Sequence, residues 1–223
     1  MTAETASESK LNRVALVAGA TGLVGRECLR MLARDERIAE VRALVRRPLP
    51  PELAAPRVRE CRVDFHRLSE HAECFEVDWV FCALGTTIRA AGSQAGFIRV
   101  DYDYVLAVAR LARERGVRDF LVVSAMGADP HSRVFYSRVK GEMERALREL
   151  GFPSLTIARP SMLLGERAEF RLGEEIGKRL ARLALARWRP VHAAQVAAAL
   201  VRAAHAAAPG VCILENPSLR TDV

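Results

Sequence analysis

The chain has 223 residues, of which 50% are hydrophobic and 27% are charged, a balance that excludes a wholly disordered or fibrous protein. Its net charge is +7, but the basic residues are spread along the whole chain, so we expect no nucleic-acid partner. No uncharged run is long enough to cross a membrane, and the five cysteines form no cluster typical of a metal site. We therefore expect free thiols, no metal, no membrane contact and a cytoplasmic location, with a flexible tail at residues 1–13.

From residue 14 onward, short apolar runs alternate with segments in which apolar residues recur every three or four positions. The apolar runs predict strands at Val14–Ala18, Val41–Val45, Val58–Val63, Trp79–Ala83, Phe120–Val123, Leu155–Ala158 and, at an edge, Cys212–Leu214. The periodic segments predict helices at Leu23–Ala33, Gly96–Arg115, Val134–Leu150, Leu172–Leu185 and His192–Ala207. Strands that alternate with helices form a parallel sheet covered on both faces. We expect one doubly wound α/β domain over residues 14–223, with residues 165–223 as its substrate-side portion.

A glycine-rich turn follows the first strand and opens the first helix. Its first glycine permits a tight bend, its second lets the backbone approach a pyrophosphate, and its third lets helix and strand pack closely. The free amides and the positive end of the helix dipole would then face the phosphates. The alternative is an ordinary turn, but the position after a first strand favours a dinucleotide. The predicted cofactor contacts in this turn are Gly19, Thr21, Gly22, Leu23, Val24 and Gly25.

The end of the second strand indicates which dinucleotide is bound. An acidic residue at this place binds the ribose hydroxyls of NAD, but this chain has Arg46 and Arg47. A guanidinium pairs with the 2′-phosphate of NADP through two parallel hydrogen bonds. The alternative is that both arginines are solvated surface residues. We expect NADP as the cofactor, with NADPH preferred over NADH.

The ends of the third and fourth strands supply further candidate contacts. Asp64 is either an acceptor for the adenine amino group or the N-cap of the helix that follows. The turn after the fourth strand is small and suits the nicotinamide half of a cofactor, although an ordinary exit from a strand has the same composition. The candidate contacts in this turn are Ala83, Leu84 and Gly85.

A serine, a tyrosine and a lysine follow the fifth strand. Ser124 lies at the tip of the strand, and Tyr136 and Lys140 are one turn apart on the same face of the next helix. A tyrosine that merely packs beside an extended lysine is the alternative. Together with the turn GATGLVG and the segments CALGTT, LVVSAMGAD and YSRVKGEME, these residues resemble the short-chain dehydrogenase/reductase family, and within it the atypical members.

The resemblance implies a Rossmann-like fold, a nicotinamide cofactor and a role for each of these side chains. Ser124 would hydrogen-bond the substrate carbonyl, and Tyr136 would be the general acid/base. Lys140 would bind the nicotinamide ribose and lower the pKa of the tyrosine towards the working pH. The family often has a relay asparagine on the preceding long helix, where this chain has Asp101. Asp101 is either its replacement or an ordinary helix residue.

The C-terminal third carries three weaker signals. The resemblance implies that Arg159 and Pro160 border the nicotinamide, whereas the residues alone also fit a strand stopped by proline. His192 is expected to begin a helix rather than to bind a ligand. The segment Phe170–Pro190 is basic and amphipathic, and we expect it to close over the substrate as a lid, with attachment to an anionic membrane as the alternative.

These features predict an NADP-dependent oxidoreductase that reduces a carbonyl, or oxidises an alcohol, of a small-molecule substrate. The first alternative is an NADPH-binding regulatory or assembly protein without turnover. The second is an epimerase or dehydratase that keeps its nicotinamide bound. The resemblance also implies a homodimer formed through two long helices.

Overall fold

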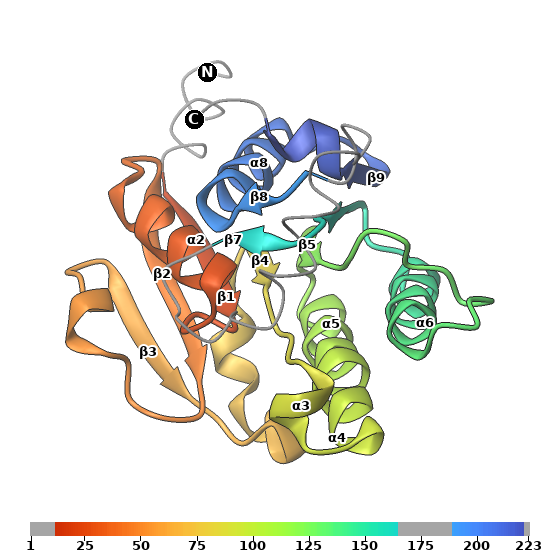
Figure 1. The fold of residues 1–223 in the computed structure, drawn as a ribbon. Helices are drawn as coiled ribbons and strands as arrows, with labels where there is room; N and C mark the ends of the chain where they lie inside the picture. Colours follow the sequence, from red (N-terminus) through yellow and green to blue (C-terminus); the bar gives the residue numbers. More distant parts are fainter. Residues whose placement is uncertain (1–11, 165–188, 221–223) are drawn as a thin grey trace.

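A computed structural model describes residues 12–164 and 189–220. Its centre is a seven-stranded sheet in which every pair of neighbouring strands is parallel, in the order β3-β2-β1-β4-β5-β6-β9 (Figure 1). The strands are β1 (Arg13–Ala18), β2 (Ile38–Val45), β3 (Val58–Arg62), β4 (Trp79–Cys82), β5 (Asp119–Val123), β6 (Ser154–Arg159) and β9 (Gly210–Glu215). The predicted doubly wound α/β fold is confirmed.

Helices cover both faces of the sheet because successive strand residues point to opposite sides. In β1, Ala15 and Val17 join a buried cluster under α2 (Leu23–Arg34) and α8 (Ala193–Ala206). The intervening Leu16 and Ala18 join a second cluster under α5 (Tyr104–Glu114) and α6 (Phe135–Glu149). Shorter helical segments are η1 (Pro51–Leu53), η2 (Phe65–Phe75), α3 (Ile88–Ala91), α4 (Gln94–Ile98), η3 (Arg99–Asp103) and η5 (Asn216–Arg220).

The single long helix expected over Gly96–Arg115 is instead three segments. The hydroxyl of Ser93 accepts a hydrogen bond from the amide of Gly96 at 3.0 Å and so begins α4. A π-helical turn, η3, then precedes α5. A π turn holds more residues than an α turn and so changes the direction in which the side chains point. The apolar spacing gave no sign of this change from α to π helix, which places Asp101 in the π-helical turn.

The C-terminal portion completes the fold. Helix α8 packs against α2 within one buried cluster, and β9 extends the sheet beyond β6. A small parallel pair, β7 (Leu163–Leu164) with β8 (Val191–His192), flanks residues 165–188, so the expected helix Leu172–Leu185 and most of the segment Phe170–Pro190 lie outside the described residues. His192 precedes α8 as expected, and its amide donates to the Gln195 side chain at 3.2 Å. Among the described helices, none is both long and apolar enough to cross a membrane.

Candidate functional site

The glycine turn meets the turn after β4 at the place where the strand order reverses, between β1 and β4. In open α/β sheets this is the point where ligands bind, beyond the carboxyl ends of the strands. Gly19 has φ +82°, and a Cβ there would lie 2.5 Å from the carbonyl oxygen of Ala83. The amide of Ala83 donates to Ala18 O at 2.8 Å, which continues the strand pairing for one residue. Only glycine therefore fits at position 19.

The two other glycines shape the start of α2. Gly22 is the N-cap, its amide donates to Gly19 O at 2.9 Å, and it has no side chain to cover the first amides of the helix. A Cβ at Gly25 would overlap the carbonyl oxygen of Gly19, so this glycine sets how closely helix and turn approach. Val24 is buried beneath the turn and Leu23 is partly buried. The groups of these two residues that remain for a ligand are their backbone amides.

The residues around this turn fit a dinucleotide. The amino end of the twelve-residue helix α2 offers backbone amides and a positive dipole to a pyrophosphate. The Nε atom of Arg26, one turn into the same helix, is buried and has no hydrogen-bond partner among the described residues. A buried donor without a partner is costly, and an anion beside the turn would supply one. Thr21 lies in the same turn and is partly buried.

The remaining adenine-side candidates lie at the ends of β2 and β3. Arg46 and Arg47 are both exposed and form no ion pair within the described part of the chain. The carboxylate of Asp64 accepts the amide of His66 at 2.9 Å and is the N-cap of η2. This hydrogen bond, together with the charges of His66 and Arg67, lowers the pKa of Asp64. Asp64 is thus an N-cap, and its expected contact with the adenine amino group stays a prediction.

A buried ion pair lies beneath the turn after β4. Lys140 Nζ is 2.7 Å from Asp101 Oδ1, and both side chains are almost fully buried. The second carboxylate oxygen, Oδ2, accepts the amide of Thr86 at 2.8 Å. A Cβ at Gly85 would lie 3.4 Å from Asp101 Oδ1 and 4.0 Å from Lys140 Nζ. Asp101 is thus no ordinary helix residue, because it joins α6 to the turn expected to contact the nicotinamide.

Tyr136 lies one turn before Lys140 on α6 and is 38% exposed. Its ring packs 5.4 Å, centroid to centroid, from the buried ring of Phe97 in α4. Partial burial raises the pKa of Tyr136 above its ordinary value, while Lys140 lowers it and Asp101 raises it further. Lys140 therefore lowers the pKa of Tyr136 as expected. The pKa is nevertheless raised overall, because burial and the charge of Asp101 outweigh the effect of the lysine.

Ser124 is buried and hydrogen-bonded within the protein. It is 4% exposed, and its hydroxyl donates to Glu144 Oε1 at 2.6 Å. A hydroxyl has one proton to donate, so this bond conflicts with the expected hydrogen bond from Ser124 to a substrate carbonyl. The sequence could not reveal this partner, because β5 and α6 bring the two side chains together only in the fold.

Arg159 is also engaged within the protein. Its Nε and Nη2 atoms lie 3.0 and 2.6 Å from the two oxygens of Glu144, and Nη1 is 3.0 Å from Glu215. Hydrogen bonding to Glu144 raises the pKa of Arg159. The side chain therefore holds α6 and β9 to the end of β6, and its expected place beside the nicotinamide stays a prediction. The buried Pro160 ends that strand, and its carbonyl accepts the amide of Met126 at 2.8 Å.

Glu144 is the residue that the sequence analysis missed. It is buried on α6 and binds both Ser124 and Arg159. The signal was present, because Tyr136, Lys140 and Glu144 follow one another at intervals of four and so form one stripe along the helix. A charged residue on the buried stripe of a helix requires a partner, and this requirement would have identified it.

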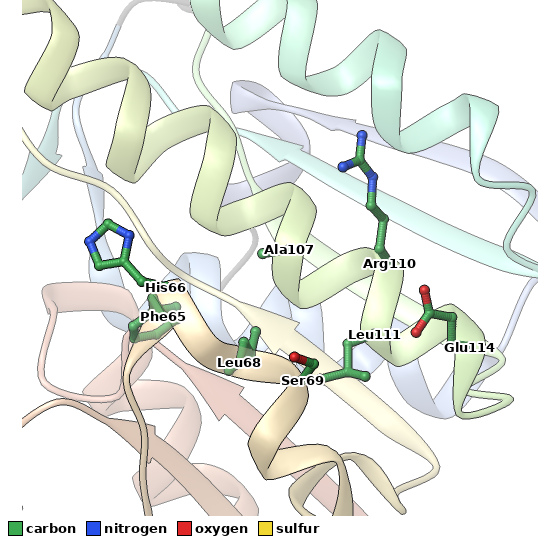
Figure 2. A pocket seen from close by; sticks show the side chains of 8 residues that line it. All are labelled: Phe65, His66, Leu68, Ser69, Ala107, Arg110, Leu111 and Glu114. Atoms are coloured by element: carbon green, nitrogen blue, oxygen red, sulfur yellow. The ribbon is translucent and has the colours of Figure 1, made fainter.

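A separate hollow of about 240 Å³ lies between η2 and α5. Figure 2 shows Leu68 and Ser69 on η2 opposite Leu111 and Glu114 on α5. None of the residues that line it is a predicted site residue, so the hollow is distinct from the glycine turn and from the Lys140–Asp101 pair. Within the described residues there is also no group of three or more His, Cys, Asp or Glu side chains that could hold a metal ion.

Comparison with known proteins agrees with this geometry. The NAD(P)H-binding family matches residues 19–207, from the first glycine of the turn to the end of α8. The chain belongs to this family. It is similar to the rat protein HTATIP2, with 40% identity over 170 residues that cover 75% of this chain and 70% of that protein. These matches confirm the resemblance to the atypical short-chain dehydrogenases/reductases.

Relatives in fungi correct one expectation about this member of the NAD(P)H-binding family. The Eremothecium gossypii protein FMP52 is 40% identical over 159 residues, which cover 71% of this chain and 70% of that protein. The Saccharomyces cerevisiae FMP52 is 37% identical over 153 residues, covering 68% and 66%. Both are named as mitochondrial proteins. The expected cytoplasmic location is contradicted by these names.

Solved structures of more distant proteins share the fold. MoeE5 in complex with UDP-glucuronic acid and NAD has a TM-score of 0.72 at 21% identity, covering 91% of this chain and 75% of that chain. The Helicobacter pylori ADP-L-glycero-D-manno-heptose-6-epimerase has a TM-score of 0.68 at 16% identity, covering 92% and 77%. These likenesses show that the chain has a Rossmann-like fold.

Proposed function

We propose that the protein is an NADP-dependent oxidoreductase that reduces the carbonyl group of a small molecule, or oxidises the corresponding alcohol. The observation that carries the proposal is the placement of Tyr136 and Lys140. Both lie on one face of α6, and Lys140 is buried beside Gly85, in the turn that follows β4 at the ligand-binding edge. A tyrosine with only a packing role would not need a buried ammonium one turn away.

Each side chain has a distinct task in the proposed reaction. When bound, the nicotinamide cofactor supplies or takes up hydride at the substrate carbon. Tyr136 donates the proton to the carbonyl oxygen, and the charge of Lys140 opposes the rise that burial causes in the pKa of the phenol. Lys140 binds the nicotinamide ribose hydroxyls, and the glycine turn holds the pyrophosphate.

The proposal is tested by screening aldehydes, ketones and quinones with NADPH oxidation as the readout. We expect at least one class to be reduced at a rate that depends on Tyr136. A protein that binds NADPH and oxidises it with no member of a broad panel would instead favour the regulatory or assembly function. Exchange of a substrate stereocentre without net oxidation of NADPH would favour an epimerase.

NADPH should bind at least about tenfold more tightly than NADH, because a guanidinium–phosphate contact readily supplies the required 1.4 kcal/mol or so. Arg46 and Arg47 are exposed at the end of β2, where the adenosine ribose would lie. Calorimetric titration of both cofactors measures the ratio. Arg46→Ala should reduce it, whereas the exposed Arg89 of α3 serves as the control and Arg89→Ala should leave it unchanged. Equal affinities in the unmodified protein would contradict the choice of NADP.

Replacement of Ser124 by alanine should lower stability more than turnover. The change leaves Glu144 with Arg159 but removes a 2.6 Å hydrogen bond from a buried carboxylate, at a cost of about 1–3 kcal/mol. We expect the thermal midpoint to fall by about 2–4 °C for each kcal/mol, and turnover to stay within a few-fold of the unmodified protein. A hundredfold loss of turnover with an unchanged thermal midpoint would instead show that Ser124 contacts the substrate, as the family resemblance implies.

A further inference from the structure

The Lys140–Asp101 pair has a geometry that only a carboxylate can complete. Asp101 divides its two oxygens, with Oδ1 on the ammonium of Lys140 and Oδ2 on the amide of Thr86. An asparagine side chain has one acceptor oxygen and two donor hydrogens. It would satisfy one of these partners and turn an N–H group towards the other. The chemistry of the site therefore explains why this chain has an aspartate here.

The ammonium of Lys140 also has few other ways to remain charged. It is 3% exposed, and burial disfavours the charged form of a lysine by up to about 3–5 pKa units when no partner is present. The ionisable groups that face it are Asp101 from η3, Tyr136 from its own helix and Cys82 from β4. Burial raises the pKa of Cys82 to about 12, so this thiol is neutral and supplies no counter-charge.

Asp101 is thus the group that opposes the effect of burial. Burial alone would lower the pKa of Lys140, but attraction from Asp101, with a smaller contribution from Tyr136, raises it above its ordinary value. The carboxylate also fixes where the ammonium lies, because the amide of Thr86 anchors its other oxygen to the turn after β4. The charge and the position of Lys140 therefore depend on one side chain.

We propose that Asp101 is a positioning residue that keeps the buried Lys140 charged and holds it against the turn at residues 83–87, where the nicotinamide ribose is received. This inference rests on the proposed function for the role of Lys140 in cofactor binding. It adds that the π-helical turn at Arg99–Asp103 is the device that delivers the carboxylate.

The test is the pH dependence of NADPH affinity, which needs no substrate. In the unmodified protein, affinity should be flat from about pH 7 to pH 10, because Lys140 stays charged over this range. In Asp101→Asn the buried ammonium loses its counter-ion, so affinity should begin to fall at least about one pH unit lower, and by at least about tenfold at pH 10. Asp119→Asn is the matched control. Asp119 is another buried aspartate, but it lies at the amino end of β5, whereas the candidate site lies beyond the carboxyl ends of the strands.

A second experiment tests whether the change in the pH dependence of NADPH affinity arises from Lys140. In a Lys140→Met background, adding Asp101→Asn should produce no further change in the pH profile, since the group being controlled is absent. A shift that persists in that background overturns the inference. The inference is also overturned if Asp101→Asn lowers the NADPH affinity by the same factor at every pH, because that result would show that Asp101 has only a structural role.

The unmodified protein tests the inference even if Asp101→Asn does not fold. A fall in its NADPH affinity centred between about pH 7 and pH 8.5 would show a lysine that loses its charge despite Asp101, and would overturn the proposal. Failure of the proposed function gives a different result, because the unmodified protein would then bind NADPH with a flat profile and turn over no substrate, or would not bind NADPH at all.

Discussion

Tyr136→Phe should lose at least about a hundredfold in turnover, since general acid catalysis contributes about 10²–10⁴ in rate. The change removes one oxygen from a half-exposed side chain and leaves the ring against Phe97, so the fold should be unaffected. NADPH affinity should stay within a few-fold, because Lys140 and the glycine turn are unchanged. Steady-state rates with a substrate found in the screen, together with calorimetry, measure both quantities.

The control for this variant is Tyr104→Phe. The hydroxyl of Tyr104 bonds His66 Nε2 at 3.0 Å, on η2 rather than beside Lys140. The same atom is therefore lost at a place where no proton is transferred, and turnover should remain close to that of the unmodified protein. If Tyr136→Phe reduces a good substrate at the unmodified rate, the phenol is not the proton donor and the mechanism is wrong.

Gly22→Val should abolish useful NADPH binding, with a loss of at least about a hundredfold in affinity, or roughly 2.8 kcal/mol. The backbone of Gly22 has φ −77° and ψ 171°, a region that valine adopts readily. A Cβ there would lie 3.2 Å from Gly19 O, which is close but not prohibitive. The protein should therefore fold while the added methyl groups occupy the space over the helix amides where a pyrophosphate would lie. Calorimetry gives the affinity, and circular dichroism checks the fold.

Gly25→Ala is the informative contrast. Its Cβ would overlap the carbonyl of Gly19, so this variant should lose thermal stability as well as cofactor binding. If NADPH stabilises Gly22→Val as strongly as it stabilises the unmodified protein, the turn is not the phosphate site. The pair of variants separates the packing role of one glycine from the binding role of the other.

Local patterns predicted most of the fold, because strands and turns have short-range signatures. The run Val14–Ala18 and the glycines after it were enough to place β1, the turn and α2. The four-residue spacing of Tyr136 and Lys140 correctly placed both side chains on one face of a helix. These features depend only on helical and strand periodicity, which the sequence contains directly.

The partners of the buried polar groups were not predictable in the same way. Ser124 bonds Glu144, Arg159 bonds Glu144 and Glu215, and Lys140 bonds Asp101, and each of these contacts joins different parts of the fold. Periodicity says which face a residue occupies but not which charge it meets. The cytoplasmic expectation failed for another reason. That expectation rested on free thiols and on the lack of a long apolar run, and neither feature distinguishes one reducing compartment from another.

The packing of α8 on α2 has a consequence for how the protein folds as it is synthesised. Helix α2, which we propose receives the cofactor phosphates, leaves the ribosome well before α8, yet part of its apolar face is covered by α8. Until α8 emerges, that face stays open to other hydrophobic surfaces, and contacts between such distant segments form slowly. A fragment ending before residue 193 would leave the apolar face of α2 uncovered, and it should therefore aggregate rather than bind nucleotide.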